Sequence, residues 1–171
     1  MVDCIASRNI AQGIVLSDDA IVYRCSAGMV RTARDWVRCR RFPVYEGVGI
    51  MVGDNGTVQG CSANFNSFNN IQVSSGSLVA RCTANQSEGA GINLGEESVA
   101  LENVCRQNST GIRAVGNGSR IEGNSVVANT DGIRIHSPLV NNLVIKNSAM
   151  GNSTNYSIPA PTLLAGRATT V

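Results

Sequence analysis

The amino-acid sequence predicts an all-β protein of the parallel β-solenoid class, in which short strands stack coil upon coil. Three observations support this prediction: the composition, a repeat of about 21 residues, and the absence of any helix-length segment within a repeat. The 171 residues include 18 Gly and 18 Asn, whereas aromatic residues make up 4% and charged residues 15%. Gly and Asn favour tight turns and left-handed backbone conformations, so we expect many short strands joined by turns.

A Gly-Ile or Asn-Ile motif recurs along the chain and defines the repeat. The Ile residues of five successive copies lie 21, 21, 20 and 21 positions apart: Ile50, Ile71, Ile92, Ile112 and Ile133. Gly13-Ile14 upstream and Tyr156-Ser157-Ile158 downstream fit the same pattern. A unit of this size cannot bury its apolar side alone, but stacked units bury a continuous core. About seven coils fit the chain, and strands about 4.8 Å apart give a rod on the order of 30 Å long.

Three further ladders of residues keep nearly the same period. One is apolar (Val22, Val58, Val79, Leu101, Ile121, Ile145), one consists of Cys (Cys4, Cys25, Cys39, Cys61, Cys82, Cys105), and one consists of Asn (Asn64, Asn85, Asn108, Asn129, Asn152). Because the Cys residues recur at one position, we expect reduced thiols stacked in the core rather than a disulfide framework. The sequence has no C-x-x-C pair, so we expect no metal site, and we expect no cofactor. The Asn residues are expected to occupy repeated bends and to bond along the stack.

The unit of G-I-x-V, a Gly/Asn turn and V-x-G-C-x-A-N resembles the repeat of right-handed parallel β-helices of the pectin-lyase-like superfamily. The resemblance covers residues 44–158 well and residues 2–43 less well. It implies a right-handed coil with three sheets around an apolar interior, and an extracytoplasmic or cell-surface location. Relatives with this fold include polysaccharide lyases, polygalacturonase-type hydrolases and uronate epimerases. A leucine-rich repeat is the alternative fold, but Leu is scarce and no unit holds a helix-length segment.

Two intervals break the period. Cys25 and Cys39 are only 14 residues apart, so we expect a distorted short coil near residues 25–39, or a Cys25 displaced from the ladder. Five arginines gather in this part of the chain: Arg31, Arg34, Arg38, Arg40 and Arg41. They form either a solvated edge or a site for an anion or a partner. The second break, at residues 137–142, is expected to be a loop because Pro138 cannot donate to a strand ladder.

The sequence divides into a β-helix over residues 1–158 and a tail over residues 159–171. Pro159 and Pro161 are expected to stop strand formation, and Leu163 and Leu164 are candidates for a cap over the open end of the coil. At the N-terminus the repeat begins with no amphipathic capping helix before it. We therefore expect either that another subunit covers this end or that the chain is part of a longer protein. We predict a homo-oligomer that forms through a coil end or a sheet face.

The candidate ligand-binding surface is the outward face of the strands that carry the Gly-Ile motif. If each Ile points inward, strand alternation places the next residue outward. The resulting outward column reads Met51, Gln72, Asn93, Arg113 and Arg134. His136, the only His, continues this face, and Asp131 and Glu88 lie at its rim. Arginine and amide side chains suit hydrogen bonds to a sugar carboxylate, and the alternative is an ordinary solvated sheet face.

Two functions stay open at this point. The first is a non-catalytic β-helix module, structural or carbohydrate-interacting, that associates with itself. The second is a small polysaccharide-active enzyme, a lyase, epimerase or glycoside hydrolase, that acts on an acidic glycan. The outward column contains no carboxylate, so no residue can be assigned a catalytic role by the patterns of the known enzymes. A net charge of +2 argues against a nucleic-acid partner, and no apolar stretch approaches the roughly 18–20 residues that span a membrane. The sequence also contains no secretion-signal pattern.

Overall fold

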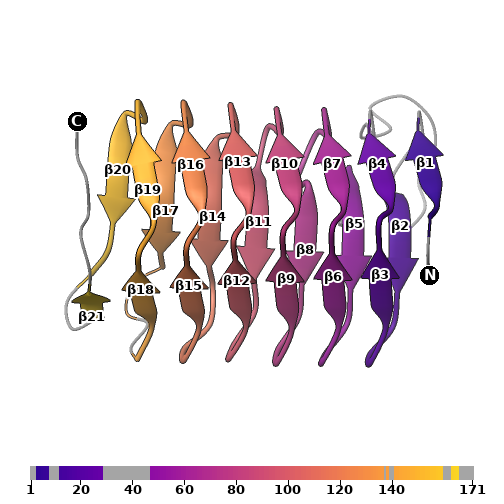
Figure 1. Ribbon diagram of the computed structural model, residues 1–171, viewed down its shortest axis with the longest axis horizontal. Helices are drawn as coiled ribbons and strands as arrows, with labels where there is room; N and C mark the ends of the chain where they lie inside the picture. The colour runs from indigo at the N-terminus through magenta and orange to yellow at the C-terminus, as the bar shows by residue number, and fades with distance from the viewer. Residues whose placement is uncertain are drawn as a thin grey trace, which may run out of the picture.

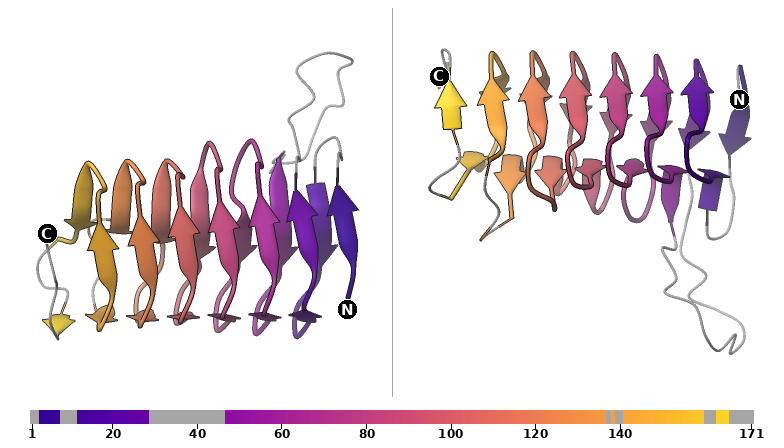
Figure 2. Two further views of the ribbon diagram at one scale, coloured as in Figure 1. Left: turned by 45° about the horizontal axis from the view of Figure 1, so that its top comes forward. Right: turned by 90° about the horizontal axis from the view of Figure 1, so that it is seen from below.

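The structure is a computed structural model that describes residues 3–7, 12–28, 47–136, 138, 141–159 and 163–165. Within these residues the chain forms 21 short strands, and every third strand enters the same sheet (Figure 1). The result is three sheets of seven parallel strands, which confirms the predicted β-solenoid. Figure 2 shows the sheets as rows of arrows along the rod. None of the described residues belongs to a helix that is long and apolar enough to cross a membrane.

Each sheet takes one strand from every coil. Sheet 1 consists of β1 (Ile5–Ser7), β4 (Ser26–Gly28), β7 (Ser62–Asn64), β10 (Thr83–Asn85), β13 (Val104–Arg106), β16 (Ser125–Val127) and β19 (Ser148–Met150). Sheet 2 consists of β2 (Gln12–Leu16), β5 (Val48–Val52), β8 (Ile71–Val73), β11 (Ala90–Leu94), β14 (Thr110–Ala114), β17 (Asp131–Ile135) and β20 (Thr154–Ser157). Sheet 3 consists of β3 (Ile21–Tyr23), β6 (Thr57–Gln59), β9 (Leu78–Ala80), β12 (Val99–Leu101), β15 (Arg120–Glu122), β18 (Leu143–Ile145) and β21 (Leu163–Ala165).

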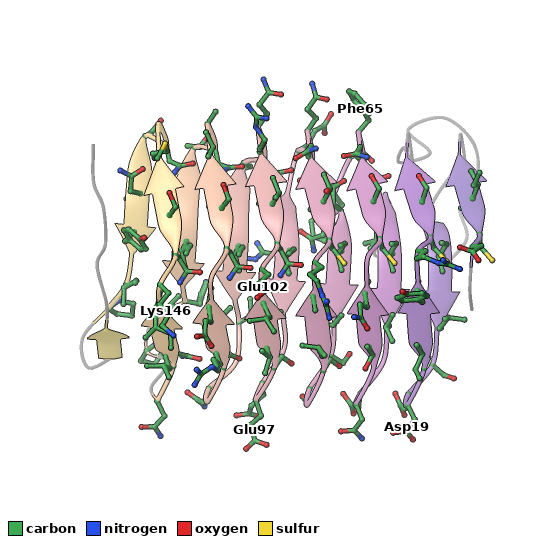
Figure 3. All side chains as sticks on the ribbon, in the orientation of Figure 1. Asp19, Phe65, Glu97, Glu102 and Lys146 are labelled. Atoms are coloured by element: carbon green, nitrogen blue, oxygen red, sulfur yellow. The ribbon has the colours of Figure 1, made fainter. Side chains whose placement is uncertain are left out.

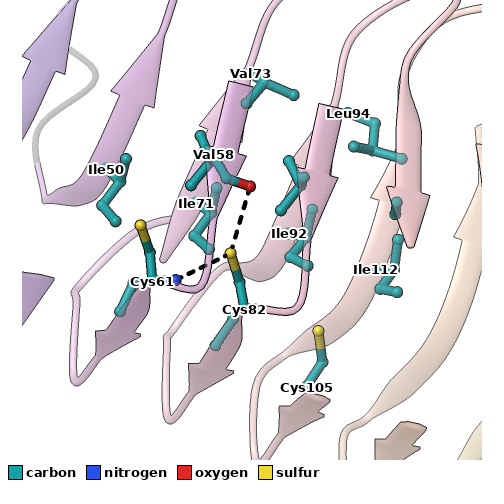
Figure 4. Close-up of a cluster of buried hydrophobic side chains, with 14 of the residues drawn as sticks. Ile50, Val58, Cys61, Ile71, Val73, Cys82, Ile92, Leu94, Cys105 and Ile112 are labelled. Carbon is teal, nitrogen blue, oxygen red and sulfur yellow. Dashed lines mark hydrogen bonds between the residues drawn. The ribbon is translucent and has the colours of Figure 1, made fainter. Parts of the chain in front are cut away.

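The repeated Ile residues form the inward column of sheet 2, as predicted. The strand register pairs Ile14, Ile50, Ile71, Ile92, Ile112, Ile133 and Tyr156 in this order. The five Ile residues from Ile50 to Ile133 are fully buried, and Figure 4 shows four of them side by side in the core. Each buried Ile removes enough apolar surface from water to contribute about 1.5–3 kcal/mol. This column is therefore a main source of stability for the stack.

The apolar ladder of sheet 3 differs from the prediction in two coils. Its inward positions are Val22, Val58, Val79, Ala100, Ile121 and Val144. The predicted Leu101 and Ile145 are off by one residue, and both are only half-buried. In both coils the strand consists of three apolar residues, and the inward residue is the middle one. The choice of a larger neighbouring side chain was therefore wrong. Sheet 1 turns mostly small side chains inward, such as Ala63 and Ala84, and Cys105 belongs to this column.

Over the residues that the structure describes, each corner between two sheets in the regular coils contains one residue with positive φ. The corner between sheets 1 and 2 uses Phe65, Gln86, Gln107, Ala128 and Gly151; the corner between sheets 2 and 3 uses Asp19, Asn55, Gly76, Glu97, Gly118 and Asn141; the corner between sheets 3 and 1 uses Asp3, Arg24, Gly60, Arg81, Glu102, Gly123 and Lys146. Figure 3 labels five of these residues: Phe65 at the upper edge, Asp19 and Glu97 along the lower edge, and Glu102 and Lys146 along the corner that crosses the middle of the view. One left-handed residue turns the chain sharply without breaking the stack, at a cost of roughly 1–2 kcal/mol where it is not Gly.

In most corners the residue after the left-handed residue has a polar or thiol side chain that turns inward and accepts a backbone N–H from the neighbouring coil. In the corner between sheets 2 and 3, the backbone N–H of Ser77 donates to Ser98 Oγ at 3.2 Å, and that of Ser98 donates to Ser119 Oγ at 3.3 Å. In the corner between sheets 1 and 2, the N–H of Asn108 donates to Asn129 Oδ1 at 2.9 Å. These side chains satisfy buried backbone groups that the corner would otherwise leave without a partner.

The third corner uses thiols in its first four coils and amides in its last three. The residues in order are Cys4, Cys25, Cys61, Cys82, Asn103, Asn124 and Asn147. The N–H of Cys61 donates to Cys82 Sγ at 3.4 Å, whereas the N–H of Cys82 donates to Asn103 Oδ1 at 2.9 Å. Figure 4 shows the thiol contact inside the core. All five described Cys are free thiols, in agreement with the prediction.

The Cys and Asn ladders inferred from the sequence therefore need correction. Cys105 faces inward from sheet 1, and Asn103 takes its expected place in the corner. Asn64 and Asn85 pair with each other in sheet 1. Each lies two residues before the corner position of its own coil, the position that Asn108 holds in a later coil. Thiol and amide side chains both accept a backbone N–H in the corner. Aligning the repeats by residue type therefore gave the wrong position where Asn replaces Cys.

The interval after Cys25 is an insertion rather than a short coil. β4 pairs directly with β7, and the N–H of Cys25 donates to Cys61 Sγ across 36 residues, 15 more than the usual 21. No coil can stand between these two, so Cys25 is in the ladder and Cys39 is not part of it. The arginine run and Cys39 lie outside the described residues, so the structure does not test the anion site expected there.

The second break and the tail also have defined positions. The coil that contains Pro138 is two residues longer than the usual coil, because Ser119 bonds to Asn142 across 23 residues rather than 21. Pro138 is exposed in a turn, as expected for a loop. Beyond Pro159 the chain forms β21, which pairs with β18. Leu163 and Leu164 thus extend sheet 3 by one strand, where the sequence suggested that strand formation had ended.

Candidate functional site

The outward face of sheet 2 brings the predicted ligand-binding residues into one column. Its members follow one another in register: Val15, Met51, Gln72, Asn93, Arg113, Arg134 and Ser157. Each lies one residue after a member of the inward column. The column is apolar at its first coils, carries amides in the middle and carries guanidinium groups at β14 and β17.

Neighbouring side chains fix the orientation of the two amides. Asn69 is fully buried; its Oδ1 accepts the backbone N–H of Ala90 at 2.9 Å, so its Nδ2 must donate to Gln72 Oε1, at 2.7 Å. Arg113 Nε donates to Asn93 Oδ1 at 2.7 Å. Both amide oxygens are therefore engaged. Within the described residues, Gln72 Nε2, Asn93 Nδ2 and the Nη groups of Arg113 donate to no protein acceptor. Three successive coils thus carry N–H donors without a protein acceptor, of which those of Gln72 and Arg113 belong to half-buried residues and that of Asn93 to a residue that is 7% exposed.

The positive charge of the two arginines is only partly neutralised by acidic side chains on this face. Arg134 lies next to Arg113 in register, and its Nη1 is 3.2 Å from Asp131 Oδ2. Arg113 has no such carboxylate partner among the described residues. Burial lowers the pKa of Arg113, and the positive charge of Arg134 lowers it further. A guanidinium remains protonated at neutral pH, and a ligand carboxylate here would stabilise the charged form of Arg113.

Two shallow hollows lie on this face. The first, of about 440 Å³, is lined by Asp54, Phe68, Asn69, Gln72, Val73, Ser74, Ser75, Asn93, Gly95, Arg113 and Val115. The second, of about 390 Å³, is lined by Arg134, Ile135, His136, Ser157, Ile158 and Pro159. The first combines an aromatic ring, oriented amides, a guanidinium and a carboxylate. Such convergence of apolar and polar groups is typical of small-molecule sites.

The remaining predicted residues have different positions. His136 follows β17, where its backbone N–H donates to Ala114 O at 3.1 Å, and its exposed side chain lines the second hollow. Asp131 starts β17 and is paired with Arg134. Glu88 is exposed and lines neither hollow. Phe68 and Asp54 line the first hollow, and the sequence analysis did not identify either. A signal existed for Phe68, because a Phe within an Asn/Ser-rich turn is unusual in a chain with so few aromatic residues.

The thiol column does not fit a metal centre. Cys61 and Cys82 are buried, and their Sγ atoms contact backbone N–H and carbonyl groups of neighbouring coils. The interaction between the neighbouring thiol groups lowers the pKa of Cys61 and raises the pKa of Cys82. Burial raises the pKa of Cys105. Over the described parts of the chain, no three His, Cys, Asp or Glu side chains form a group that could hold a metal ion.

Comparison with known proteins places the chain in a family. A family model described as "Periplasmic copper-binding protein (NosD)" matches residues 4–163. No curated protein matches the sequence. Among solved structures, the periplasmic alginate epimerase AlgG superposes with a TM-score of 0.77 at 18% identity, over 98% of this chain and 44% of that chain. A point mutant of AlgG gives a TM-score of 0.68 at 16% identity, over 99% of this chain and 46% of that chain.

The A-module of the mannuronan C-5 epimerase AlgE4 of Azotobacter vinelandii superposes with a TM-score of 0.62 at 11% identity, over 98% of this chain and 58% of that chain. The chain therefore spans about half the length of these epimerases. At such low identity the likeness shows the fold alone, which is a parallel β-helix. The family model covers nearly the whole chain and all three sheets, and on this basis the chain belongs to the NosD family.

Proposed function

We propose that the chain is a non-catalytic, carbohydrate-interacting β-helix module that binds an acidic polysaccharide along the outward column of sheet 2. The observation that carries this proposal is the row of oriented donors on Gln72, Asn93 and Arg113, followed by Arg134 on the next coil. A ligand rich in hydroxyl and carboxylate oxygens matches donors of this kind. Strands about 4.8 Å apart repeat on the scale of a sugar unit, so consecutive coils can contact consecutive units.

The net positive charge of this face determines which sugars it binds. Arg113 and Arg134 together face one carboxylate, Asp131, so an anionic group adds charge-assisted hydrogen bonds without displacing an existing pair. Each such bond contributes about 1.5–3 kcal/mol, which corresponds to roughly tenfold or more in affinity. A uronate unit supplies the carboxylate in planar form, which a guanidinium binds with two parallel bonds.

The test is calorimetric titration of a 1,4-linked uronate oligosaccharide into the wild-type protein. We expect binding that weakens as salt increases, and a loss of roughly a hundredfold in the double variant Arg113→Ala/Arg134→Ala. Arg106→Ala is the matched control, because Arg106 is an exposed arginine on β13 of sheet 1. Equal affinity of the double variant and the wild type would contradict the proposal, as would an equal loss in the control.

A second candidate function is catalysis on the same glycan, and the position of His136 favours it. Its exposed imidazole lines the second hollow beside Arg134 and Ser157, where a proton could be removed next to a bound carboxylate. The shared fold with alginate epimerases is consistent with this candidate. The proton NMR spectrum of the oligosaccharide after incubation separates the two functions. Any change that His136→Ala abolishes would establish the enzyme, and an unchanged spectrum with retained binding supports the module.

Copper binding is the property in the family description, and the described residues of this chain do not support it. The thiols are engaged inside the core, and His136 lies alone on the opposite side of sheet 2. We therefore derive no function through copper. The family description and AlgG are both periplasmic, and we propose an extracytoplasmic location for this chain on that basis. Fractionation of cells that express the complete gene tests this location.

Self-association is part of the same proposal. The first coil exposes large apolar side chains on two sheets: Ile5 is 83% exposed on β1 and Ile21 is 60% exposed on β3. Contact with a second copy would remove this surface from water. Light scattering at tens of micromolar is expected to give a mass above that of one chain, and Ile5→Ser/Ile21→Ser is expected to lower it. A wild-type mass equal to one chain would contradict self-association.

A further inference from the structure

The first hollow is lined by Arg113 and also by groups that the arginines do not supply. Phe68 lies at one rim and is 37% exposed, and Asp54 lies near the other ends of the strands. The backbone of Phe68 is held between two coils, because its N–H donates to Gly47 O at 3.2 Å and its O accepts Gly89 N–H at 3.0 Å. A Cβ atom on Gly89 would lie 2.8 Å from Phe68 O, so this loop is closely packed. The aromatic ring is therefore presented by a rigid support.

The carboxylate of Asp54 is the acceptor of this hollow. Its Oδ1 accepts the backbone N–H of Ser75 at 2.9 Å, which fixes its position and leaves Oδ2 for a ligand hydroxyl. Gln72 Nε2 and Asn93 Nδ2 supply donors between Asp54 and Phe68. An acceptor, two donors and an apolar ring together match the hydroxyl groups and the apolar C–H face of a pyranose.

The carboxylate of Asp54 also repels an anionic sugar. A ligand carboxylate over β8 would approach the negative charge of Asp54, which disfavours binding there, while the positive charge of Arg113 lies two coils away on β14. The second hollow differs, because its one neighbouring carboxylate, Asp131, is already paired with Arg134. The face thus favours an uncharged unit at β8 and β11 and an anionic unit at β14 and β17.

We propose that the hollow between Phe68 and Asp54 is a subsite for a neutral pyranose, so that the ligand is a heteropolysaccharide in which an uncharged sugar adjoins a uronate. This inference rests on the proposed function, since it divides the same face into two subsites. Phe68 stacks on the uncharged sugar, Asp54 accepts its hydroxyl, and Arg113 marks the boundary with the anionic subsite.

The experiment compares two oligosaccharides of equal length: one alternates neutral hexose and uronate units, and the other contains uronate alone. Calorimetry is expected to show tighter binding of the alternating ligand to the wild type. Phe68→Ala should lower affinity for the alternating ligand about tenfold and leave that for the uronate ligand unchanged, because only the former places a neutral ring on Phe68. Asp54→Asn should improve binding of the uronate ligand. Phe65→Ala is the matched control, since Phe65 is exposed at a corner outside the hollow.

The outcomes separate this inference from the proposed function. Uronate binding that depends on Arg113 and Arg134, with no preference for the alternating ligand and no selective effect of Phe68→Ala, would overturn the neutral subsite alone. Failure of both ligands to bind the wild type would overturn the proposed function and the subsite together. An equal loss in Phe65→Ala would also overturn the subsite, because that change does not touch the hollow.

Discussion

Two columns of sheet 2 lie one residue apart and follow opposite rules. The inward column is Ile in six successive coils, from Ile14 to Ile133, and ends with Tyr156. The outward column changes in almost every coil, from Val15 and Met51 through amides to arginines. The inward position has the same surroundings in every coil, so the same side chain suits each one. The outward position lies on the surface of the rod, where Asn93 alone among these residues is buried, so its residues can vary at little cost to the core.

The largest expected contrast between the columns comes from neighbouring residues of β14. Ile112→Asp places a carboxylate without a partner in the apolar core and should lower the free energy of unfolding by about 4 kcal/mol or more, or prevent folding. Arg113→Ala should change it by less than about 1 kcal/mol, because Arg113 is half-buried and makes one side-chain hydrogen bond. Urea unfolding followed by circular dichroism measures both. Similar losses in the two variants would show that the register is wrong.

The corner between sheets 3 and 1 extends the comparison from apolar to polar inward residues. Asn124 is buried; its Oδ1 accepts the N–H of Asn103 at 2.8 Å and its Nδ2 donates to Ala100 O at 3.0 Å. Asn124→Ala removes both hydrogen bonds, leaves the buried N–H of Asn103 without its acceptor, and should cost about 3 kcal/mol. Asn124→Cys should cost about half as much, since a thiol occupies this position in the first four coils. Chemical denaturation of the two variants tests whether thiol and amide are interchangeable, and equal costs would contradict it.

The smallest effect is expected at the left-handed corner positions. Ala128 has φ of 57°, is exposed, and corresponds to Gly151 in the next coil. Ala128→Gly should raise the free energy of unfolding by up to about 1 kcal/mol, because Gly adopts positive φ without steric cost. Ala84→Gly, at a buried strand position, should lower it by about the same amount. A shift of the thermal midpoint in the same direction for both variants would contradict the assignment of the corners.

Much of the fold could be predicted from the sequence, because each coil repeats the same environment. The Ile column was identified with its register, and with it the outward column of Gln72, Asn93, Arg113 and Arg134. The errors occurred where two residue types perform one role. Asn103 takes over from Cys82 in the corner because amide oxygen and thiol sulfur both accept a backbone N–H, so identity alone could not show that Cys105 lies elsewhere.

The insertion after Cys25 was misinterpreted for a different reason. Cys39 lies 22 residues before Cys61, close to one repeat, and so imitated a coil that the pairing of β4 with β7 rules out. The first hollow was not predicted because Phe68 and Asp54 belong to turns, whose positions recur but whose residue types change from coil to coil. Their positions follow from corner geometry, which the left-handed residues determine and which strand alternation does not encode.

The central claim is that the inward column stabilises the fold and the outward column binds the ligand. The most direct test measures urea unfolding and affinity for the uronate oligosaccharide on two neighbouring variants. Ile112→Val, which keeps the core apolar, should lower stability by about 1 kcal/mol and leave affinity unchanged. Arg113→Ala should lower affinity about tenfold and leave stability nearly unchanged. If both variants change the same quantity, or if Arg113→Ala binds as well as the wild type, this division between the two columns is contradicted.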